Sequence, residues 1–308
     1  MFPTSLSGST QQYLADLDRT ETQLQQTTTQ ISSGLDVQQP SDDPEAISEI
    51  LQTETSISNN KQIQSNLGNV TSEVDAADSA LQTAVQAVQS AISIATQASS
   101  STAATNSNAV LAQQVAGIQQ TLVNITQTTV NGRYIFSGDQ DTQPPYELDA
   151  SQPEGVQQLV TGSSTRTIQS VDGTSFAVAL TAQQIFDARN ADGTPASGNV
   201  FAAVQNLETA LTNNDTAGIA SAETSLQSAS SYLNDQLAFY GDVENRVTEA
   251  TDLATKFQTQ QTTELSNLQD TDIPTAATEL SQLQVQQQAA MSVESSLEQM
   301  KNLFSYLA

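Results

Sequence analysis

Apolar residues recur every seven positions along much of the chain, a pattern typical of helices that pack along a narrow seam. The first set comprises Leu67, Val74, Leu81, Val88 and Ala95, together with Val70, Ala77, Ala84, Ala91 and Ala98. After a break rich in Ser, Thr and Asn at residues 99–108, a helical stripe follows with Leu111, Val115, Ile118, Leu122, Ile125 and Thr129. We expect these segments to form one side of a helical rod.

The second half of the chain repeats this pattern. One position of the repeat holds Leu226, Leu233, Tyr240, Val247, Ala254 and Leu268, and the next holds Ala229, Val243, Ala250 and Phe257. Polar Gln236, Gln261 and Glu264 interrupt it. The simplest interpretation is that both halves pack against each other within one molecule, as an outgoing and a returning arm.

Each end of the chain carries a further amphipathic helix. The spaced positions are Leu17, Leu24 and Ile31 near the N-terminus, and Ala276, Leu283, Ala290, Leu297 and Phe304 with Val293, Met300 and Leu307 near the C-terminus. Pro40 and Pro274 separate these helices from the middle of the chain. Two polar helices of about 35 residues bury little surface alone. We therefore predict an interface between subunits; the alternative is a pair packed within one monomer.

Residues 138–199 differ in composition from the rest of the chain, because they are rich in Pro and Gly. Alternating runs at 165–171 and 175–180, split by Asp172-Gly173, predict a β-hairpin. The expected fold is mainly α: an elongated helical rod or coiled coil with paired terminal helices and a small β-rich insertion. The predicted domains are 1–39 with 273–308 for assembly, 40–137 with 200–272 for the rod, and 138–199 for the insertion.

Composition narrows the function. The chain has 34 acidic and 8 basic residues, a net charge of -26, so neither nucleic acid nor an acidic membrane is an expected partner. It has no Cys and no His, which excludes disulfides, thiolate metal sites and His-dependent triads. No signal peptide and no apolar run of about 20 residues is visible. We expect no catalytic, cofactor or metal site, and a cytoplasmic protein unless a dedicated export route exists.

The acidic cluster Asp42, Asp43 and Glu45 has two interpretations. Paired carboxylates can perform catalysis or bind a hard cation, but a calcium loop needs more oxygen ligands at alternating positions. Helix capping explains all three residues: Asp42 with Glu45 as a capping box, or Asp43 as the cap with Pro44 in the first turn. We favour capping.

Two motifs resemble a known family. Ser33-Gly34 followed by Pro40-Ser41-Asp42-Asp43-Pro44 resembles the signature of the flagellin superfamily, and Asn131-Gly132-Arg133-Tyr134-Ile135-Phe136-Ser137-Gly138 resembles that of hook-associated protein 3, or FlgL. The residues at 289–294 and 303–307 are also similar to that family. In structural terms, we expect Asn131-Gly132 to end a helix and Arg133 to Phe136 to form a strand, with Tyr134 and Phe136 on one face and Ile135 on the other.

The resemblance implies a flagellin-like fold and a subunit of the junction between flagellar hook and filament, which nucleates flagellin polymerisation. It implies self-assembly into a ring, contact with the hook-side junction protein and flagellin, and passage, with an export chaperone, through the flagellar type III apparatus to the extracellular flagellum. We predict that Leu297→Asp leaves the monomer folded and blocks assembly. The alternatives are flagellin itself, a secreted translocator or adhesin, and a carbohydrate-active enzyme with two carboxylates.

Overall fold

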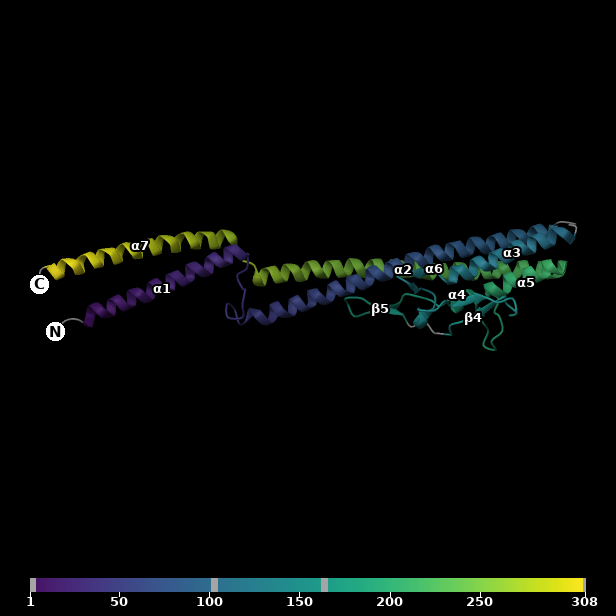
Figure 1. Ribbon diagram of the computed structural model, residues 1–308, viewed down its shortest axis with the longest axis horizontal. Helices are drawn as coiled ribbons and strands as arrows, with labels where there is room; N and C mark the ends of the chain where they lie inside the picture. The colour runs from purple at the N-terminus through teal and green to yellow at the C-terminus, as the bar shows by residue number, and fades with distance from the viewer. Residues whose placement is uncertain (1–3, 101–104, 162–165, 307–308) are drawn as a thin grey trace. The chain divides into compact units, whose positions relative to one another are not determined.

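The computed structural model describes residues 4–100, 105–161 and 166–306, with side chains at 11–100, 107–161 and 166–296. Its helices are α1 (Thr4–Ser33), α2 (Ala46–Ser100), α3 (Thr105–Thr126), α4 (Ala182–Phe186), α5 (Val200–Thr212), α6 (Thr216–Gln269) and α7 (Ile273–Tyr306), with a 3₁₀ helix, η1 (Gly138–Gln140) (Figure 1). The strands are β1 (Thr129–Val130), β2 (Arg133–Tyr134), β3 (Tyr146–Leu148), β4 (Val156–Gln158), β5 (Thr167–Gln169) and β6 (Ser175–Ala177). The fold is mainly helical, as predicted. Two compact units divide it: residues 1–59 with 258–308, and residues 60–257.

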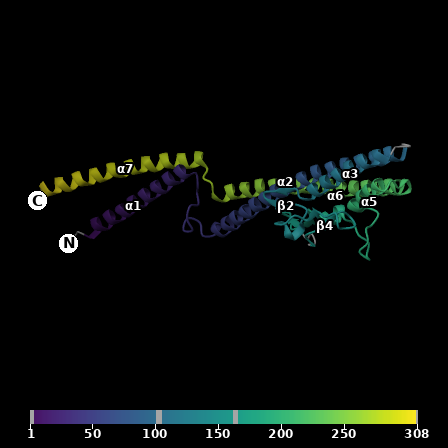
Figure 2. The ribbon, with the colours of Figure 1, turned by 45° about the vertical axis from the view of Figure 1, so that its right-hand side comes forward.

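The core of the 60–257 unit follows the predicted heptads. In this unit α2 and α6 run side by side, with α3 and α5 beside them (Figures 1 and 2). Leu67, Leu81 and Val88 on α2 and Leu226 and Leu233 on α6 are fully buried. Alanines occupy many of the remaining seam positions, so the helices can approach closely. Phe257 departs from the pattern, because its side chain is 38% exposed.

The loop before α2 confirms the capping interpretation, in its second form. The Asp43 carboxylate accepts hydrogen bonds from the backbone N–H of Glu45 at 3.0 Å and of Ala46 at 3.1 Å. Asp42 instead accepts from the backbone N–H of Gln38 and Gln39. Asp43 therefore caps the start of α2, whereas Asp42 holds the backbone of the loop that precedes it.

The segment that follows α3 differs from the prediction. The helix already ends at Thr126, and Thr129 lies in β1 rather than on the helical stripe. Asn131 and Gly132 form the two-residue turn between β1 and β2, both with positive φ (52° and 77°). Asn-Gly is the favoured sequence for such a turn, because its backbone twist matches that of the paired strands. The prediction that Asn131-Gly132 ends a helix was therefore wrong.

The predicted alternation after this turn was also wrong. The strand β2 stops at Tyr134, which is half-buried, and both Ile135 and Phe136 are buried. Phe136 packs edge-on against Phe186, which stacks on Phe201. The segment thus leaves the sheet and enters an aromatic core between the rod and the inserted region.

The inserted region consists of small antiparallel strand pairs and the short helix α4. The sheet β3–β4 pairs Tyr146 with Gln158, and the sheet β5–β6 pairs Ile168 with Phe176. The second pair confirms the predicted hairpin, with its turn at Asp172-Gly173 and a positive φ of 84° at Gly173. The helix α4 begins with a capping box between Thr181 and Gln184.

Candidate functional site

The terminal helices α1 and α7 pack along a seam within one subunit. The seam-facing positions, buried or half-buried, are Tyr13, Leu17, Thr20, Leu24, Thr27 and Ile31 on α1 and Ala276, Leu280, Leu283, Gln287, Ala290 and Glu294 on α7. The Tyr13 hydroxyl donates a hydrogen bond to the carbonyl oxygen of Ala290. The spacing alternates between three and four residues, as in a coiled coil.

The predicted interface residues divide between this seam and other places. Leu17, Leu24, Ile31, Leu283 and Ala290 lie in the seam within the subunit. Val293 does not, because it is 50% exposed on the other side of α7. The side chains of Leu297, Met300 and Phe304, and all of Leu307, lie outside the described residues. A role of these residues between subunits stays a prediction.

Backbone hydrogen bonds join the segment that follows α1 to the segment that precedes α7. Leu35 and Asp270 form an antiparallel bridge. The Asp36 N–H donates to the Gln269 carbonyl at 2.7 Å, and the Thr271 N–H donates to the Gly34 carbonyl at 2.9 Å. Gly34 has a φ of +77°, which ends α1 and turns the chain into the bridge. This gives the Ser33-Gly34 motif a structural role that the sequence alone did not reveal.

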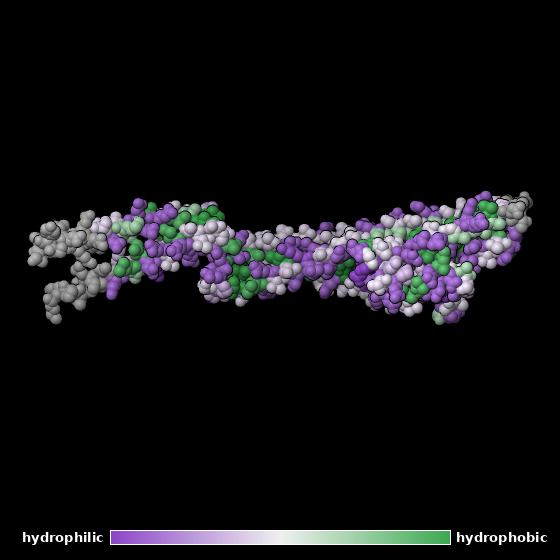
Figure 3. All heavy atoms as spheres, in the orientation of Figure 1, coloured by the Kyte–Doolittle hydropathy of each residue, from purple (hydrophilic) through white to green (hydrophobic). Residues whose placement is uncertain are grey.

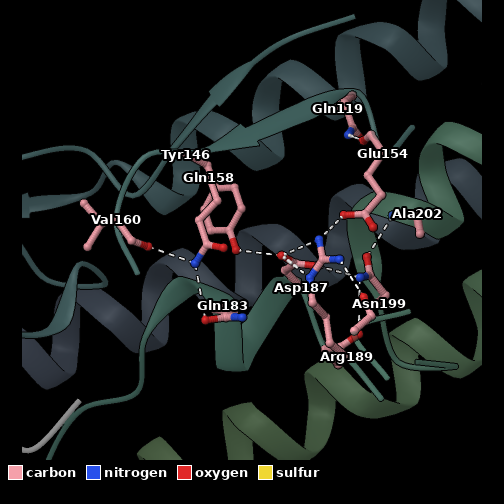
Figure 4. A network of polar contacts seen from close by, with 12 residues as sticks. Gln119, Tyr146, Glu154, Gln158, Val160, Gln183, Asp187, Arg189, Asn199 and Ala202 are labelled. Atoms are coloured by element: carbon pink, nitrogen blue, oxygen red, sulfur yellow. Dashed lines mark hydrogen bonds and ion pairs between the residues drawn. The ribbon is translucent and has the colours of Figure 1, made fainter. Parts of the chain in front are cut away.

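A second cluster of functional groups is buried in the inserted region (Figure 4). The Asp187 carboxylate, whose side chain is fully buried, accepts hydrogen bonds from the Tyr146 hydroxyl at 2.8 Å and the Asn199 amide at 2.7 Å. Arg189 lies between two acids, 3.0 Å from Asp187 and 2.6 Å from Glu154. The network therefore ties together β3, the loop before β4, the end of α4 and the start of α5.

Burial has electrostatic consequences in this network. Burial, reinforced by the charge of Asp187, raises the pKa of Glu154. Burial and the same carboxylate raise the pKa of Tyr146 far above its usual range. Because Asp187 is enclosed and its oxygens are already hydrogen-bonded, the cluster has the properties of a structural network rather than of a site open to substrate. Its members lie far apart in the sequence and carry no periodic signal.

Two tyrosines of α6 anchor the inserted region to the rod. The Tyr240 hydroxyl accepts a hydrogen bond from the Leu180 N–H at 3.1 Å, and the Tyr232 hydroxyl donates to the Gln184 carbonyl at 2.5 Å. Burial raises the pKa of Tyr240 to about 12. The Arg166–Glu73 ion pair, at 2.5 Å, adds a charged contact. Tyr240 is a seam residue in the predicted heptad, and the hydroxyl gives it a second role.

Among the described residues, no group of three or more acidic side chains is arranged to hold a metal ion. Asp42 and Asp43 hold backbone N–H groups instead, and the Arg133 guanidinium pairs with Asp141 beside the β1–β2 turn. In the described part of the chain, no helix is long and apolar enough to cross a membrane. The geometry of these residues is explained by folding contacts.

Comparison with known proteins assigns the family. The model of the bacterial flagellin N-terminal helical region matches residues 5–141, and that of the bacterial flagellin C-terminal helical region matches residues 219–307. The chain belongs to the flagellin superfamily. The two matches of this flagellin-superfamily chain leave out residues 142–218, which hold most of the inserted region and α5. No curated protein sequence gives a significant match.

Solved structures of flagellar proteins share the fold of this flagellin-superfamily chain. Hook-associated protein 3 from Legionella pneumophila has a TM-score of 0.60 at 15% identity, covering 71% of this chain and 98% of that one. FlgL from Bacillus cereus has a TM-score of 0.56 at 15% identity, covering 70% and 99%. FlgL from Xanthomonas campestris has a TM-score of 0.55 at 14% identity, covering 68% and 99%. At these identities the likeness concerns the fold.

Proposed function

We propose that this protein is a structural subunit of the flagellar junction between hook and filament, and that it nucleates flagellin polymerisation. The observation that carries the proposal is the likeness in fold to FlgL structures over nearly their whole length, in a chain whose two arms match flagellin. The Asn131 to Gly138 segment, which resembles the FlgL signature, supports the same choice. It forms the exit from the rod into the inserted region.

The proposed mechanism is assembly rather than catalysis. The terminal helices of neighbouring subunits pack together into a ring. The partners are further copies of the chain, the hook-side junction protein and flagellin. Export through the flagellar type III apparatus, with a chaperone, brings the subunit to the extracellular flagellum. The acidic side chains support a structural role, because those in the buried network are occupied by Arg189, Tyr146 and Asn199.

A filament subunit is the second candidate, because the two matching family models describe flagellin. The two roles differ in abundance and in position. A filament subunit is the major protein of sheared flagella, whereas a junction subunit is present in a few copies at one end of each filament.

Deletion of the gene in the bacterium that encodes it tests the proposal. We expect hooks without filaments by electron microscopy, with monomeric flagellin in the medium by immunoblot, and recovery of filaments when the gene is restored. Loss of flagellin from both cells and medium would identify this chain as flagellin. Normal filaments in a strain without a second copy of the gene would reject both flagellar roles and favour a secreted translocator or adhesin.

A further inference from the structure

The β5–β6 hairpin contacts both of the long helices. The Arg166 guanidinium, next to the start of β5, pairs with the Glu73 carboxylate of α2 at 2.5 Å. The Arg246 guanidinium of α6 lies over the ring of Phe176 in β6, 4.4 Å from the ring centroid. Such a cation is attracted by the negative face of the ring. One small hairpin therefore connects the outgoing arm of the rod to the returning arm.

One face of this hairpin is buried. Ile168 and Phe176 are directly paired across the two strands, and each is only 7% exposed. Their neighbours within each strand are exposed, so the side chains alternate between two faces. Both buried side chains belong to the same apolar core as the long helices. Figure 3 shows mainly hydrophilic side chains, with scattered apolar ones, on the visible face of the inserted region. The hairpin thus packs its apolar face on the rod.

Along α6, the hairpin lies beyond the part that α5 covers. The two helices are joined by a short turn at residues 213–215, and Gly198, just before α5, lies against the Tyr232 ring. The contacts of the hairpin on α6 come later in the chain, at Tyr240 and Arg246. From Tyr240 onward, α6 is therefore held by the hairpin rather than by α5.

Along α2, the hairpin lies at the end of the part that α3 covers. The last turn of α3 ends at Thr126. Ile125 lines a shallow surface hollow together with Ala76 and Ala80 of α2. Glu73, the partner of the hairpin on α2, lies one turn before Ala76. The hairpin therefore takes over from α3 and α5 at the same place along the rod.

Beyond the hairpin, the seam between α2 and α6 is weaker. The Asn60 amide, which is 3% exposed, donates a hydrogen bond to the Ala254 carbonyl at 2.8 Å. The side-chain oxygen of Asn60 has no hydrogen-bond partner in the described part of the chain. A buried polar atom without a partner lowers stability. Because neither α3 nor α5 reaches this end of the helix pair, we expect it to open first.

Charge also opposes closure of the helix pair at the hairpin. The two long helices run antiparallel, with Thr96 bonded to Glu223 and Asn60 to Ala254. This register brings two acidic stretches to the same place: Glu73, Asp75 and Asp78 on α2, and Asp242, Glu244 and Glu249 on α6. Repulsion between them favours separation of the helices. Arg166 supplies a positive charge there, and its ion pair is largely buried, with the two side chains 23% and 17% exposed.

We propose that the β5–β6 hairpin is a strap that holds α2 and α6 closed where α3 and α5 end. Opening of the helix pair from its Asn60–Ala254 end stops at this strap. The rod then has a part that stays closed and a part that opens reversibly while the rest of the unit remains folded. The inference does not depend on the flagellar role, because it concerns contacts within residues 60–257 of one chain.

Amide hydrogen exchange of the full chain, followed by mass spectrometry, tests the strap. The variant Arg166→Gln with Arg246→Gln removes both charged contacts of the hairpin. Arg133→Gln is the matched control, because Arg133 also pairs with a carboxylate, that of Asp141, which is not on a long helix. Circular dichroism checks that each variant is folded. If the double variant does not fold, Glu73→Gln removes the ion pair alone and is measured in the same way.

In the wild type, we expect residues 60–69 and 249–257 to exchange faster than the residues at the strap, 70–78 and 238–248. In the double variant, exchange at the strap should become about tenfold faster, because an ion pair and a cation–π contact are lost together. Residues 80–98 and 219–236, beside α3 and α5, should change little, and Arg133→Gln should leave exchange at the strap unchanged. Glu73→Gln should give the same pattern with a smaller increase.

Three results would overturn the inference. Unchanged exchange at the strap would show that the hairpin does not hold the helices. An equal increase over all of residues 60–257 would show that it contributes only to global stability. Equal exchange in the wild type at the strap and at 60–69 with 249–257 would show that opening does not stop there.

Discussion

At the scale of single residues, the buried acid Glu154 makes stability depend on pH. Its pKa is raised, mainly by burial and then by the charge of Asp187. A carboxyl whose pKa is raised on folding contributes stability that is present below the pKa of the unfolded chain and is lost as pH rises through the folded pKa. The wild-type protein therefore loses this contribution between acid and neutral pH.

Glu154→Gln removes the titratable carboxyl and keeps an oxygen that can accept a hydrogen bond from Arg189. We expect the melting temperature of the variant, relative to wild type, to rise as pH increases from about 4 to about 7. Circular dichroism at several pH values measures it. Asp149→Asn is a control of opposite sign, because hydrogen bonds from Ser151 lower the pKa of Asp149. Its relative stability should fall as pH rises through the range below about 4, where the wild-type carboxyl ionises, and should stay level from about 4 to about 7. A rise for Asp149→Asn that parallels the rise for Glu154→Gln would contradict the assignment.

These residues also mark the limit of what the sequence could predict. Glu154, Asp187 and Arg189 have no spacing that distinguishes them from solvent-exposed charges. They form a network only because the strand β3, the end of α4 and the start of α5 meet in space. The capping role of Asp43 could be predicted, because its backbone partners are its own neighbours in sequence.

At the scale of elements, the long helices could be predicted and the shortest strands could not. Heptad repeats extend over many turns of α2 and α6, so one exposed residue such as Phe257 does not obscure them. The hairpin β1–β2 has two residues in each strand, too few for a period to appear. Asn131-Gly132 was therefore predicted to end the preceding helix, although the same pair is also a strong signal for a hairpin turn.

Two glycines in different elements predict opposite effects of the same substitution. Gly68 is exposed in α2, and a Cβ added there meets nothing within 4 Å. Gly68→Ala should therefore stabilise the protein, by about 1 kcal/mol, because alanine favours the helix. Gly132 has a φ of +77°, which an L side chain rarely adopts. Gly132→Ala should destabilise it by about 1–2 kcal/mol.

Urea unfolding of both variants and wild type, followed by circular dichroism, measures the two free energies of unfolding. Since neither position has neighbours near the added Cβ, differences in packing do not contribute, and backbone conformation alone sets the sign. Equal effects at the two positions would show that the turn at Asn131-Gly132 does not require a left-handed residue.

At the scale of the whole molecule, the family could be recognised from two short motifs and the order of the elements. The inserted region between the two flagellin arms could be placed, and one of its hairpins found, but its buried core could not. The aromatic core between this region and the rod holds Phe136, Phe186 and Phe201, which come from three separate segments and meet only in the folded chain. Local patterns predict elements, whereas a small irregular region is determined by contacts between distant segments.

The net charge of -26 leads to a prediction about the assembly of whole subunits. Repulsion between copies is strong at low ionic strength, and salt shortens its range from roughly 30 Å at 0.01 M to about 3 Å at 1 M. Contacts between neutral and apolar faces are not weakened by salt in this way. We therefore expect self-association of the purified protein, measured by sedimentation velocity at fixed protein concentration, to increase with sodium chloride. Circular dichroism under the same conditions checks that the subunits stay folded. A decrease of association with salt would mean that ion pairs hold the copies together, which contradicts the repulsion expected from the net charge of -26.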